Sequence, residues 1–487
     1  MSKRIWFSLT IVLLLAFGFA TLPPAASAHT ITVNGDPSEW TLAAPTNVNT
    51  GHIGRNSSVQ GEYIWTDHNA DVRTDGDDPD SNYELTQFRV TADANNVYFL
   101  LRFSDITNTS LPYVAIAVDT DRVSGSGESY FGDFAETQTS ANAEWEKLIV
   151  VNLSKTGYYD TSWTWTNAGS SYISNTNNVI EISMPRTALG ISWPATLRFT
   201  VIVCQHDGSG GIHDIGNSDA LDCVTNYGDP GSTPNTWSEV SDGDVDYYFD
   251  VYFNASGEPF PPVLISEVYY DTKGTDGDEE WVQIYNTTGS SISLNGWKVG
   301  DAETVDETGE GMRRFPDGYS IASDDFVIVA QKNTGFVDLG YPCSADFELV
   351  NSDVPPDMIA YTAWTGGSAG SVALSNTEDE VLLLDPCDTV VDVVAYEGGS
   401  YPGVTNHPGV STGNSIQRHS RYLDTNDCRE WNTGGDFETV SNNGTPCSIS
   451  TVVTLSSFTA SANFGMPLAL GLAVVIPLAA FLLLRRR

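Results

Sequence analysis

The sequence predicts an all-β protein, with two β-sandwich domains in tandem between an N-terminal signal peptide and a C-terminal transmembrane helix. Short runs of alternating apolar residues recur along the chain, and Gly, Asp, Thr and Asn separate them, which is the pattern of small β-sandwiches. No stretch of useful length carries a helical period. Pro259, Pro261 and Pro262 interrupt the strands near the middle, because proline donates no hydrogen bond to a ladder. The chain therefore divides there into two β-domains.

Both ends of the chain predict export. A basic pair, an apolar run and the small residues at 26–28 form a secretory signal peptide. The apolar run at 465–484 is long enough to cross a bilayer, and the three arginines that end the chain favour a cytoplasmic terminus. The same tail also fits a prokaryotic sorting signal that is cut and transferred to another anchor, so both forms of surface attachment stay open. The predicted order is a signal peptide at 1–28, a first sandwich at 29–255, a linker at 256–262, a second sandwich at 263–447, a polar linker at 448–464, the apolar helix at 465–484 and a cytoplasmic basic end at 485–487.

The chain is strongly acidic. It holds 63 Asp and Glu against 22 Lys and Arg, for a net charge of −41, and five of those cations lie in the two ends. Such a charge keeps a protein soluble and repels nucleic acid. A phosphate-binding face needs clustered Lys and Arg, and the sequence has no such cluster outside its tail. We therefore expect no nucleic-acid partner, whereas divalent cations suit this composition.

In the first half, strands that end in acidic turns are expected at 31–33, 88–90, 97–103, 114–118 and 179–184. The motifs along them, in chain order, are Asn34-Gly35-Asp36 before Glu39-Trp40, Val97-Tyr98, Asp119-Thr120-Asp121, and Glu181 to Pro185 before Leu189-Gly190. Their order resembles the family 9 carbohydrate-binding-module-like (DOMON-like) sandwich, with Asn34 where Asp is commoner. The resemblance implies a sugar-binding type of β-sandwich and supplies no catalytic site.

Two acidic segments of this domain have the composition of calcium sites, because calcium takes about six to eight oxygen ligands, many of them from carboxylates. Asp119 and Asp121 stand at the end of a strand, ahead of a Ser-Gly loop at 124–127 that can curl around an ion. Asp75 and Asp77 belong to an acidic loop between 71 and 80. A solvated acidic turn is the alternative for both segments. Calcium is the cofactor that the sequence suggests.

Sugar binding by such sandwiches depends on exposed aromatic faces that stack on pyranose rings. The candidates are Trp163 and Trp165, which share one face if their segment is a strand, and Trp65. Tryptophan in a β-sandwich is more often a core residue, so that alternative stays open for each of the three.

The second half predicts three short strands at its start, in Ile265-Ser266-Glu267-Val268, in residues 280–286 and in Leu294-Asn295-Gly296-Trp297. Further strands are expected at 326–330, 374–385, 390–396 and 415–418, the last ending in Arg418. This pattern resembles the lamin-tail domain, an immunoglobulin-like module that serves binding and anchoring, with Gln283 where that family commonly has Glu. We expect Glu267 and Glu280 to have structural roles, and Trp281 and Trp297 to anchor the core.

Six cysteines in an exported chain predict three disulfides. If no bridge crosses the linker, Cys204 pairs with Cys223. Three pairings remain for the cysteines of the second half, and the pairing of Cys428 with Cys447 is preferred because it closes a short loop. A zinc site is disfavoured, because no Cys-x-x-Cys occurs. The four cysteines of the second half are Cys343, Cys387, Cys428 and Cys447.

The sequence favours a function without catalysis. It contains no Gly-x-Ser-x-Gly elbow, no His-Glu-x-x-His and no phosphate-binding glycine loop. We expect an exported cell-surface protein that binds a glycan or a cell-envelope component through its first domain and contacts the membrane through its C-terminal helix. The alternatives are a surface carbohydrate-active enzyme and a purely structural envelope protein.

Overall fold

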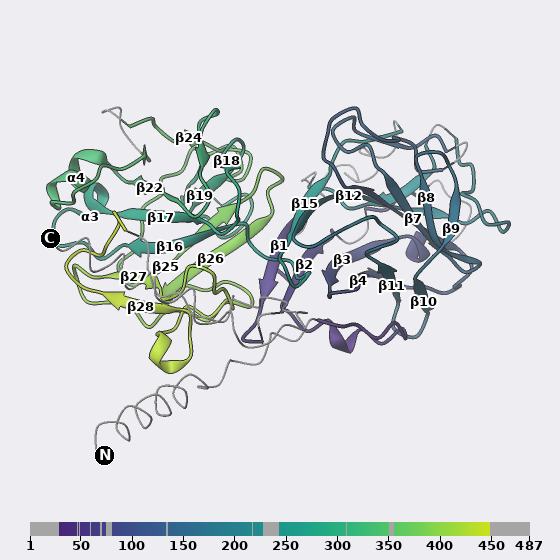
Figure 1. The fold of residues 1–487 in the computed structure, drawn as a ribbon, viewed down its shortest axis with the longest axis horizontal. Helices are drawn as coiled ribbons and strands as arrows, with labels where there is room; N and C mark the ends of the chain where they lie inside the picture. The colour runs from purple at the N-terminus through teal and green to yellow at the C-terminus, as the bar shows by residue number, and fades with distance from the viewer. Residues whose placement is uncertain are drawn as a thin grey trace, which may run out of the picture. The chain divides into compact units, whose positions relative to one another are not determined.

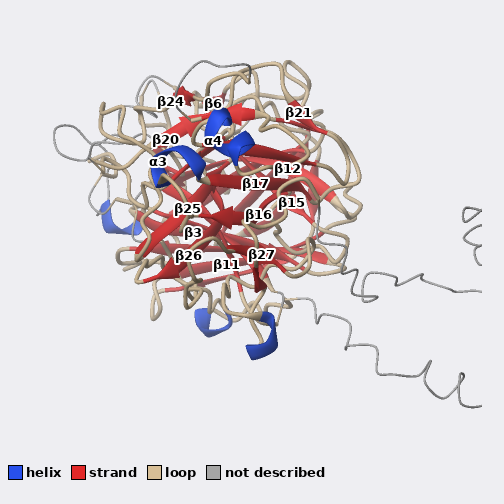
Figure 2. Cartoon of the chain, turned by 90° about the vertical axis from the view of Figure 1, so that its left-hand side faces the viewer, coloured by secondary structure: helices blue, strands red, loops and turns tan. Residues whose placement is uncertain are grey.

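The computed structural model describes residues 29–448, apart from 46, 48, 59, 69–70, 75–79, 133–134, 217, 227–242, 308 and 350–354. Strands carry nearly all of its regular structure (Figure 1), and Figure 2 shows that the helices, in blue, are few and short. The all-β prediction is confirmed for these residues. The predicted signal peptide and the apolar helix at 465–484 lie outside the described part of the chain. Within the described part, no helix is long and apolar enough to cross a membrane.

The first sandwich packs two antiparallel sheets against each other. The first sheet has the order β10 (Ser170–Ser174), β11 (Val179–Pro185), β4 (Asn96–Phe103), β3 (Leu85–Ala92), β2 (Gly61–Thr66) and β1 (Thr50–Arg55). The second sheet has the order β13 (Ala220–Cys223), β12 (Ala195–Gln205), β5 (Pro112–Asp119), β7 (Lys147–Asn152), β8 (Lys155–Asp160) and β9 (Trp165–Asn167), and β15 (Phe249–Phe253) also pairs with β12. The short strands β6 (Gln138–Thr139) and β14 (Asp244–Val245) pair with each other.

Strand β5 is buried throughout and apolar up to Val118 because both of its faces are covered, which is why its sequence shows little alternation. Val114, Ile116 and Val118 pack into the main core between the two sheets. Ala115 and Ala117 point the other way, into a second apolar cluster on the outer face. We call this second group the outer cluster; its other buried members include Tyr113, Phe131, Trp145, Leu148 and Val150.

The second sandwich also has two sheets. One has the order β23 (Phe347–Glu348), β22 (Phe326–Ala330), β17 (Trp281–Asn286), β16 (Val263–Tyr269), β27 (Ser415–Arg418) and β28 (Phe437–Val440). The other has the order β26 (Val390–Glu397), β25 (Glu378–Leu384), β19 (Lys298–Gly300), β20 (Met312–Arg314) and β24 (Ile359–Ala360), and β18 (Ile292–Ser293) pairs with β21 (Ser320–Ile321). Among the described residues, the helical pieces are η1 (Pro37–Glu39), η2 (Asp80–Asn82), α3 (Asp276–Glu279), α4 (Asn333–Asp338) and η3 (Trp431–Thr433).

The two sandwiches belong to one compact unit. His52 of β1 pairs with Val390 of β26, which joins the two sheets into one path of 11 strands. Arg55 donates to the carbonyls of Pro259 and Asp424, at 2.8 and 3.2 Å, so the proline-containing segment is held by buried polar contacts. Residues 257–261, within the predicted linker, are buried.

Two segments that were expected to be strands are not strands. Leu294–Trp297 is a turn: Trp297 donates its backbone amide to the Leu294 carbonyl at 3.1 Å, and Gly296 has a φ of +79°, which glycine adopts without strain. Residues 31–33 also lack strand pairing, because Glu39 binds the backbone amide of Thr32 at 2.7 Å. Short apolar runs do not reveal such competing partners, so the sequence pattern alone was misleading at both places.

Candidate functional site

Three half-buried aromatic side chains, Tyr159, Trp163 and Trp165, gather on the β8–β9 hairpin, whose strands lie beside β7 in Figure 1. The centroid of the Tyr159 ring lies 5.7 Å from that of Trp163 and 4.9 Å from that of Trp165. The Lys155 ammonium lies 4.9 Å from the centroid of the Trp165 ring and donates to the Tyr159 hydroxyl at 3.1 Å. We call Lys155, Tyr159, Trp163 and Trp165 the aromatic hairpin cluster. Partly exposed rings with polar groups beside them are suited to stacking on a sugar ring.

The turn of the hairpin fixes this cluster. Trp163 lies in the turn rather than in a strand, with a φ of +56°, and its ring meets the buried Trp145 ring edge-on at 5.4 Å. The Asp160 carboxylate accepts hydrogen bonds from the backbone amides of Ser162 and Thr164, at 3.0 and 3.1 Å. The amide of Thr164, and to a lesser extent that of Ser162, lowers the pKa of Asp160. Capping and packing therefore hold the rings in place before any ligand binds.

Trp65 is a core residue, so its predicted ligand role is wrong. Its side chain is fully buried among the residues of the main core. The indole N–H donates to the Thr225 carbonyl at 2.9 Å. The indole therefore has no face that a sugar could reach.

Three carboxylates meet at the end of β5. One oxygen each of Asp119, Asp121 and Glu146 lies within 4.8 Å of the others. Asp119 ends β5, and Glu146 directly precedes β7, so the antiparallel pairing of the two strands brings these residues together. Glu146 accepts hydrogen bonds from the backbone amide and the hydroxyl of Thr120, at 2.7 and 3.1 Å.

Two oxygens of this strand-end cluster remain without hydrogen bonds. Oδ1 of Asp119 accepts from the amides of Asp121 and Arg122, at 3.1 and 2.5 Å. Its Oδ2 is buried without a partner, and so is Oε1 of Glu146. Burial raises the pKa of Asp119 to about 6. An all-oxygen donor set with buried, unbonded oxygens is what a calcium ion takes.

The structure brings together only some of the residues that were predicted to bind calcium. Asp119 and Asp121 come together, and Glu146 joins them although sequence reasoning did not single it out. In the sequence, Glu146 is marked only as an acid that directly precedes an apolar strand. The pairing of β5 with β7 is what brings it to Asp119, and that pairing cannot be read from the sequence. Asp75 and Asp77 lie outside the described residues. Tyr159 was also missed, because its role depends on the register that sets it opposite Trp165.

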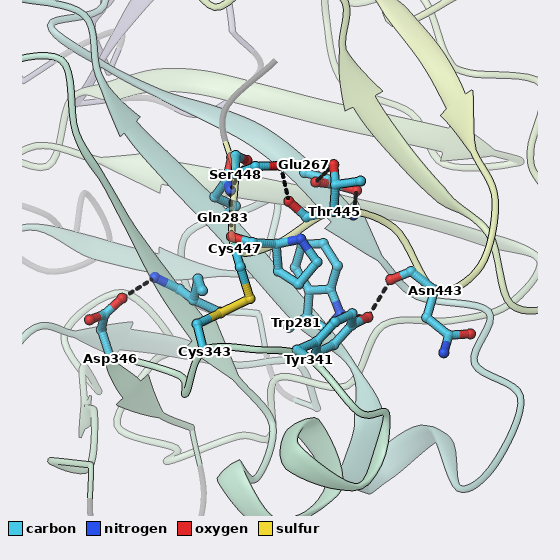
Figure 3. Close-up of a disulfide and its surroundings, with 12 residues drawn as sticks. Glu267, Trp281, Gln283, Tyr341, Cys343, Asp346, Asn443, Thr445, Cys447 and Ser448 are labelled. Carbon is cyan, nitrogen blue, oxygen red and sulfur yellow. Dashed lines mark hydrogen bonds between the residues drawn. A yellow bond between two sulfur atoms is a disulfide. The ribbon is translucent and has the colours of Figure 1, made fainter. Parts of the chain in front are cut away.

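The polar residues of the second sandwich bind the end of the domain (Figure 3). Glu267 is fully buried and accepts hydrogen bonds from Gln417 Nε2 at 2.8 Å and from the Thr445 amide at 2.9 Å. Gln283 donates to the carbonyls of Pro446 and Ser448, at 2.8 and 3.0 Å. Burial raises the pKa of Glu267 to about 7. These contacts attach the last described segment to strands β16, β17 and β27.

Glu280 and the two tryptophans predicted to lie in the core have the structural roles that were expected of them. Glu280 accepts hydrogen bonds from the Leu374 amide at 3.2 Å and from Gln331 at 3.4 Å, and burial raises its pKa to about 8. Trp281 and Trp297 are 1% and 5% exposed, so both are core residues as expected.

The disulfide pattern corrects the sequence prediction. Cys343 is bonded to Cys447, with their Cα atoms 5.7 Å apart (Figure 3). The preferred Cys428–Cys447 bridge is therefore wrong, and Cys428 is a buried thiol. The Cys204–Cys223 bridge is absent as well, because the β12–β13 register sets Cys204 opposite Ala220 and not opposite Cys223. The other four cysteines are thiols and do not form two further bridges: Cys204, Cys223, Cys387 and Cys428.

Comparison with known families confirms both resemblances. Residues 74–219 match the family described as the C-terminal binding-module, SLH-like, of glucodextranase, and this range contains both the aromatic hairpin cluster and the strand-end carboxylates. Neither matched family is described as a catalytic domain. No curated protein matches the chain. In the second half, residues 257–398 match the lamin tail domain family.

Proposed function

We propose that this protein is exported, held at a cell surface, and binds a glycan or another envelope component through the aromatic hairpin cluster without catalysing a reaction. The observation that carries the proposal is the set of three half-buried rings fixed on one hairpin. The match to a binding module over the same residues supports it. The lamin-tail half then serves as a spacer or adhesion unit between this site and the surface.

Preorganisation supports binding by these rings. Trp163 is held against Trp145, and the Trp165 indole N–H donates to the Asn167 side chain at 2.9 Å. Rings that are already ordered lose little further conformational freedom when a ligand stacks on them. Asp160, the acid of this hairpin, caps the turn through its carboxylate, so we assign it a structural role rather than that of a general acid.

A glycan array probed with the full chain, purified in mild detergent, tests the proposal. For the glycan that binds best, we expect Trp165→Ala to weaken affinity at least tenfold, or about 1.4 kcal/mol, because it removes a stacking face. Tyr172→Ala is the matched control, since Tyr172 is 50% exposed on β10 of the other sheet, and it should leave the affinity unchanged. Equal binding by both variants would contradict the proposed site. Absence of any glycan binding would favour a structural envelope protein, and release of reducing sugar would favour an enzyme.

We also propose that the carboxylates of Asp119, Asp121 and Glu146 hold calcium. A ligand that binds only the folded state adds about 2.7 kcal/mol of stability at a hundredfold excess over its Kd. EDTA should therefore lower the melting temperature of the wild type but hardly change that of Asp121→Asn. Asp105→Asn, at an exposed acid of the same domain, is the control and should keep the wild-type response. A melting temperature that ignores both calcium and EDTA would mean that these acids are solvated turn residues.

A further inference from the structure

A second group of acids lies inside the first sandwich, separate from the strand-end carboxylates. Asp67 directly follows β2, Glu84 directly precedes β3, and Asp222 lies in β13 of the other sheet. Asp71 belongs to the connection between β2 and β3. Asp67, Asp71, Glu84 and Asp222 are 5%, 2%, 3% and 0% exposed, respectively. We call these four residues the buried acid cluster.

Three members of the buried acid cluster are close enough to share one ion. One carboxylate oxygen each of Asp67, Asp71 and Asp222 lies within 4.8 Å of the others. Asp222 Oδ2 accepts a hydrogen bond from the Leu85 amide at 2.7 Å, which ties the start of β3 to β13. Glu84 Oε2 accepts from the Val72 amide at 3.4 Å. The cluster therefore joins parts of both sheets.

The electrostatics of the cluster require a compensating charge or bound protons. Burial raises the pKa of Asp67 and of Asp222 well above the ordinary value, and Asp71 and Glu84 raise both further. Acids so close together cannot all ionise in a dry interior unless a cation lies among them. The neighbouring Arg73 guanidinium donates to the carbonyls of Ser218 and Ala220.

One oxygen of the buried acid cluster supports a bound ligand by an argument that does not depend on charge. Asp67 Oδ1 accepts a hydrogen bond from the His68 amide at 2.8 Å, but Asp67 Oδ2 is buried without any hydrogen-bond partner. A buried polar atom without a partner is costly, and proteins rarely keep one unless it binds something. The donors offered are all oxygens, which suits a hard cation and excludes metals that prefer sulfur or nitrogen.

We propose that Asp67, Asp71 and Asp222, assisted by Glu84, bind a hard divalent cation, with calcium as the best fit. Calcium accepts carboxylates in mono- or bidentate modes and irregular geometry, whereas magnesium demands near-octahedral ligands. The bound ion links the end of β2 and the start of β3 to β13 in the other sheet. It therefore stabilises the edge of the sandwich. This site is distinct from the aromatic hairpin cluster and from Asp119, Asp121 and Glu146, and it does not depend on glycan binding.

Native mass spectrometry of the full chain in calcium buffer tests the proposal by counting bound ions. We expect Asp222→Asn and Asp67→Asn each to bind one calcium fewer per chain than the wild type, and Asp119→Asn to keep the ion of the buried acid cluster. In EDTA, Asp222→Asn should melt several degrees above the wild type, because it removes one of the repelling carboxylates. An equal calcium count in the wild type and in both cluster variants would overturn the proposal.

Hydrogen–deuterium exchange on the wild type decides the matter if both cluster variants fail to fold. Calcium should then slow exchange at residues 67–72 and 220–223, and magnesium at the same concentration should have a smaller effect. Protection that appears only at 119–127 would assign the calcium to the strand-end carboxylates and overturn the site proposed here. An exchange pattern that does not respond to calcium would also overturn the proposal, because the buried acid cluster would then hold no calcium ion.

Discussion

Replacing Arg418 by Met should lower the free energy of unfolding by about 3–5 kcal/mol near neutral pH, because it removes the cation that pairs directly with a group of buried acids. Arg418 ends β27, and its side chain is 1% exposed. Nη2 donates to both oxygens of Asp392, at 2.9 and 3.0 Å. Nη1 lies 3.3 Å from Asp424 and 3.6 Å from Asp436. The guanidinium thus faces three buried carboxylates, of which Asp424 also lies 4.0 Å from the Arg55 guanidinium.

The loss should depend on pH in a defined direction. Burial raises the pKa of Asp392 to about 7 and that of Asp436 to about 6, although Arg418 pulls both values down. Without the guanidinium these folded-state pKa values rise further above the unfolded value of about 3.9. A carboxyl with a raised folded pKa loses stability as pH rises through that range, because the folded state must release a tightly held proton. The variant should therefore be destabilised less at pH 5 than at pH 8.

Urea denaturation at pH 5 and pH 8 measures both effects. Arg429→Met is the matched control, because Arg429 pairs with Asp427 but its side chain is 48% exposed. Exposed pairs contribute about 0–1 kcal/mol, so this variant should unfold close to the wild type at both pH values. Equal losses in the two variants would mean that the buried network of Arg418 adds no net stability.

The strands of the second sandwich were the part of the fold that the sequence predicted best. β16, β17, β22 and β27 alternate apolar and polar residues or carry β-branched runs, and local pattern therefore identifies them. The same pattern also predicted burial at Trp281, because a large aromatic ring in an apolar strand usually packs into the core.

Features that depend on tertiary contacts could not be predicted from the sequence. The Leu294–Trp297 turn takes its form from Gly296 and a local hydrogen bond, although its composition suits a strand. Trp65 and Trp163 are the same residue type in similar polar surroundings, yet one lies in a strand between two sheets and the other in a capped turn. Only the assembled sheets separate them.

The acidic sites show the same division. Asp119 and Asp121 are neighbours in the chain, so their proximity is visible in the sequence. Glu146 reaches them through an antiparallel pairing, and Asp222 reaches Asp67 from the other sheet. Carboxylates are frequent throughout this chain, so no local spacing marks which of them converge.

Removing the Cys343–Cys447 bridge should lower the free energy of unfolding by about 2–5 kcal/mol, because the bond closes a long loop and so restricts the unfolded chain. The two cysteines are 104 residues apart, and the bridge fixes the end of the second sandwich. Near it, Tyr341 donates to the Asn443 carbonyl, so the double variant Cys343→Ala/Cys447→Ala should also loosen the segment at 441–448. The double variant avoids leaving an unpaired thiol.

Thermal melting with and without a reductant checks this result. The wild type should lose stability when reduced, whereas the double variant should not respond, and Cys387→Ala, at a free thiol, should respond like the wild type. Alkylation under denaturing, non-reducing conditions should label four thiols, and peptide mapping should find Cys343 joined to Cys447. A mapped link between Cys428 and Cys447 would contradict this pairing, because Cys447 could not then hold the chain end against the region of Cys343.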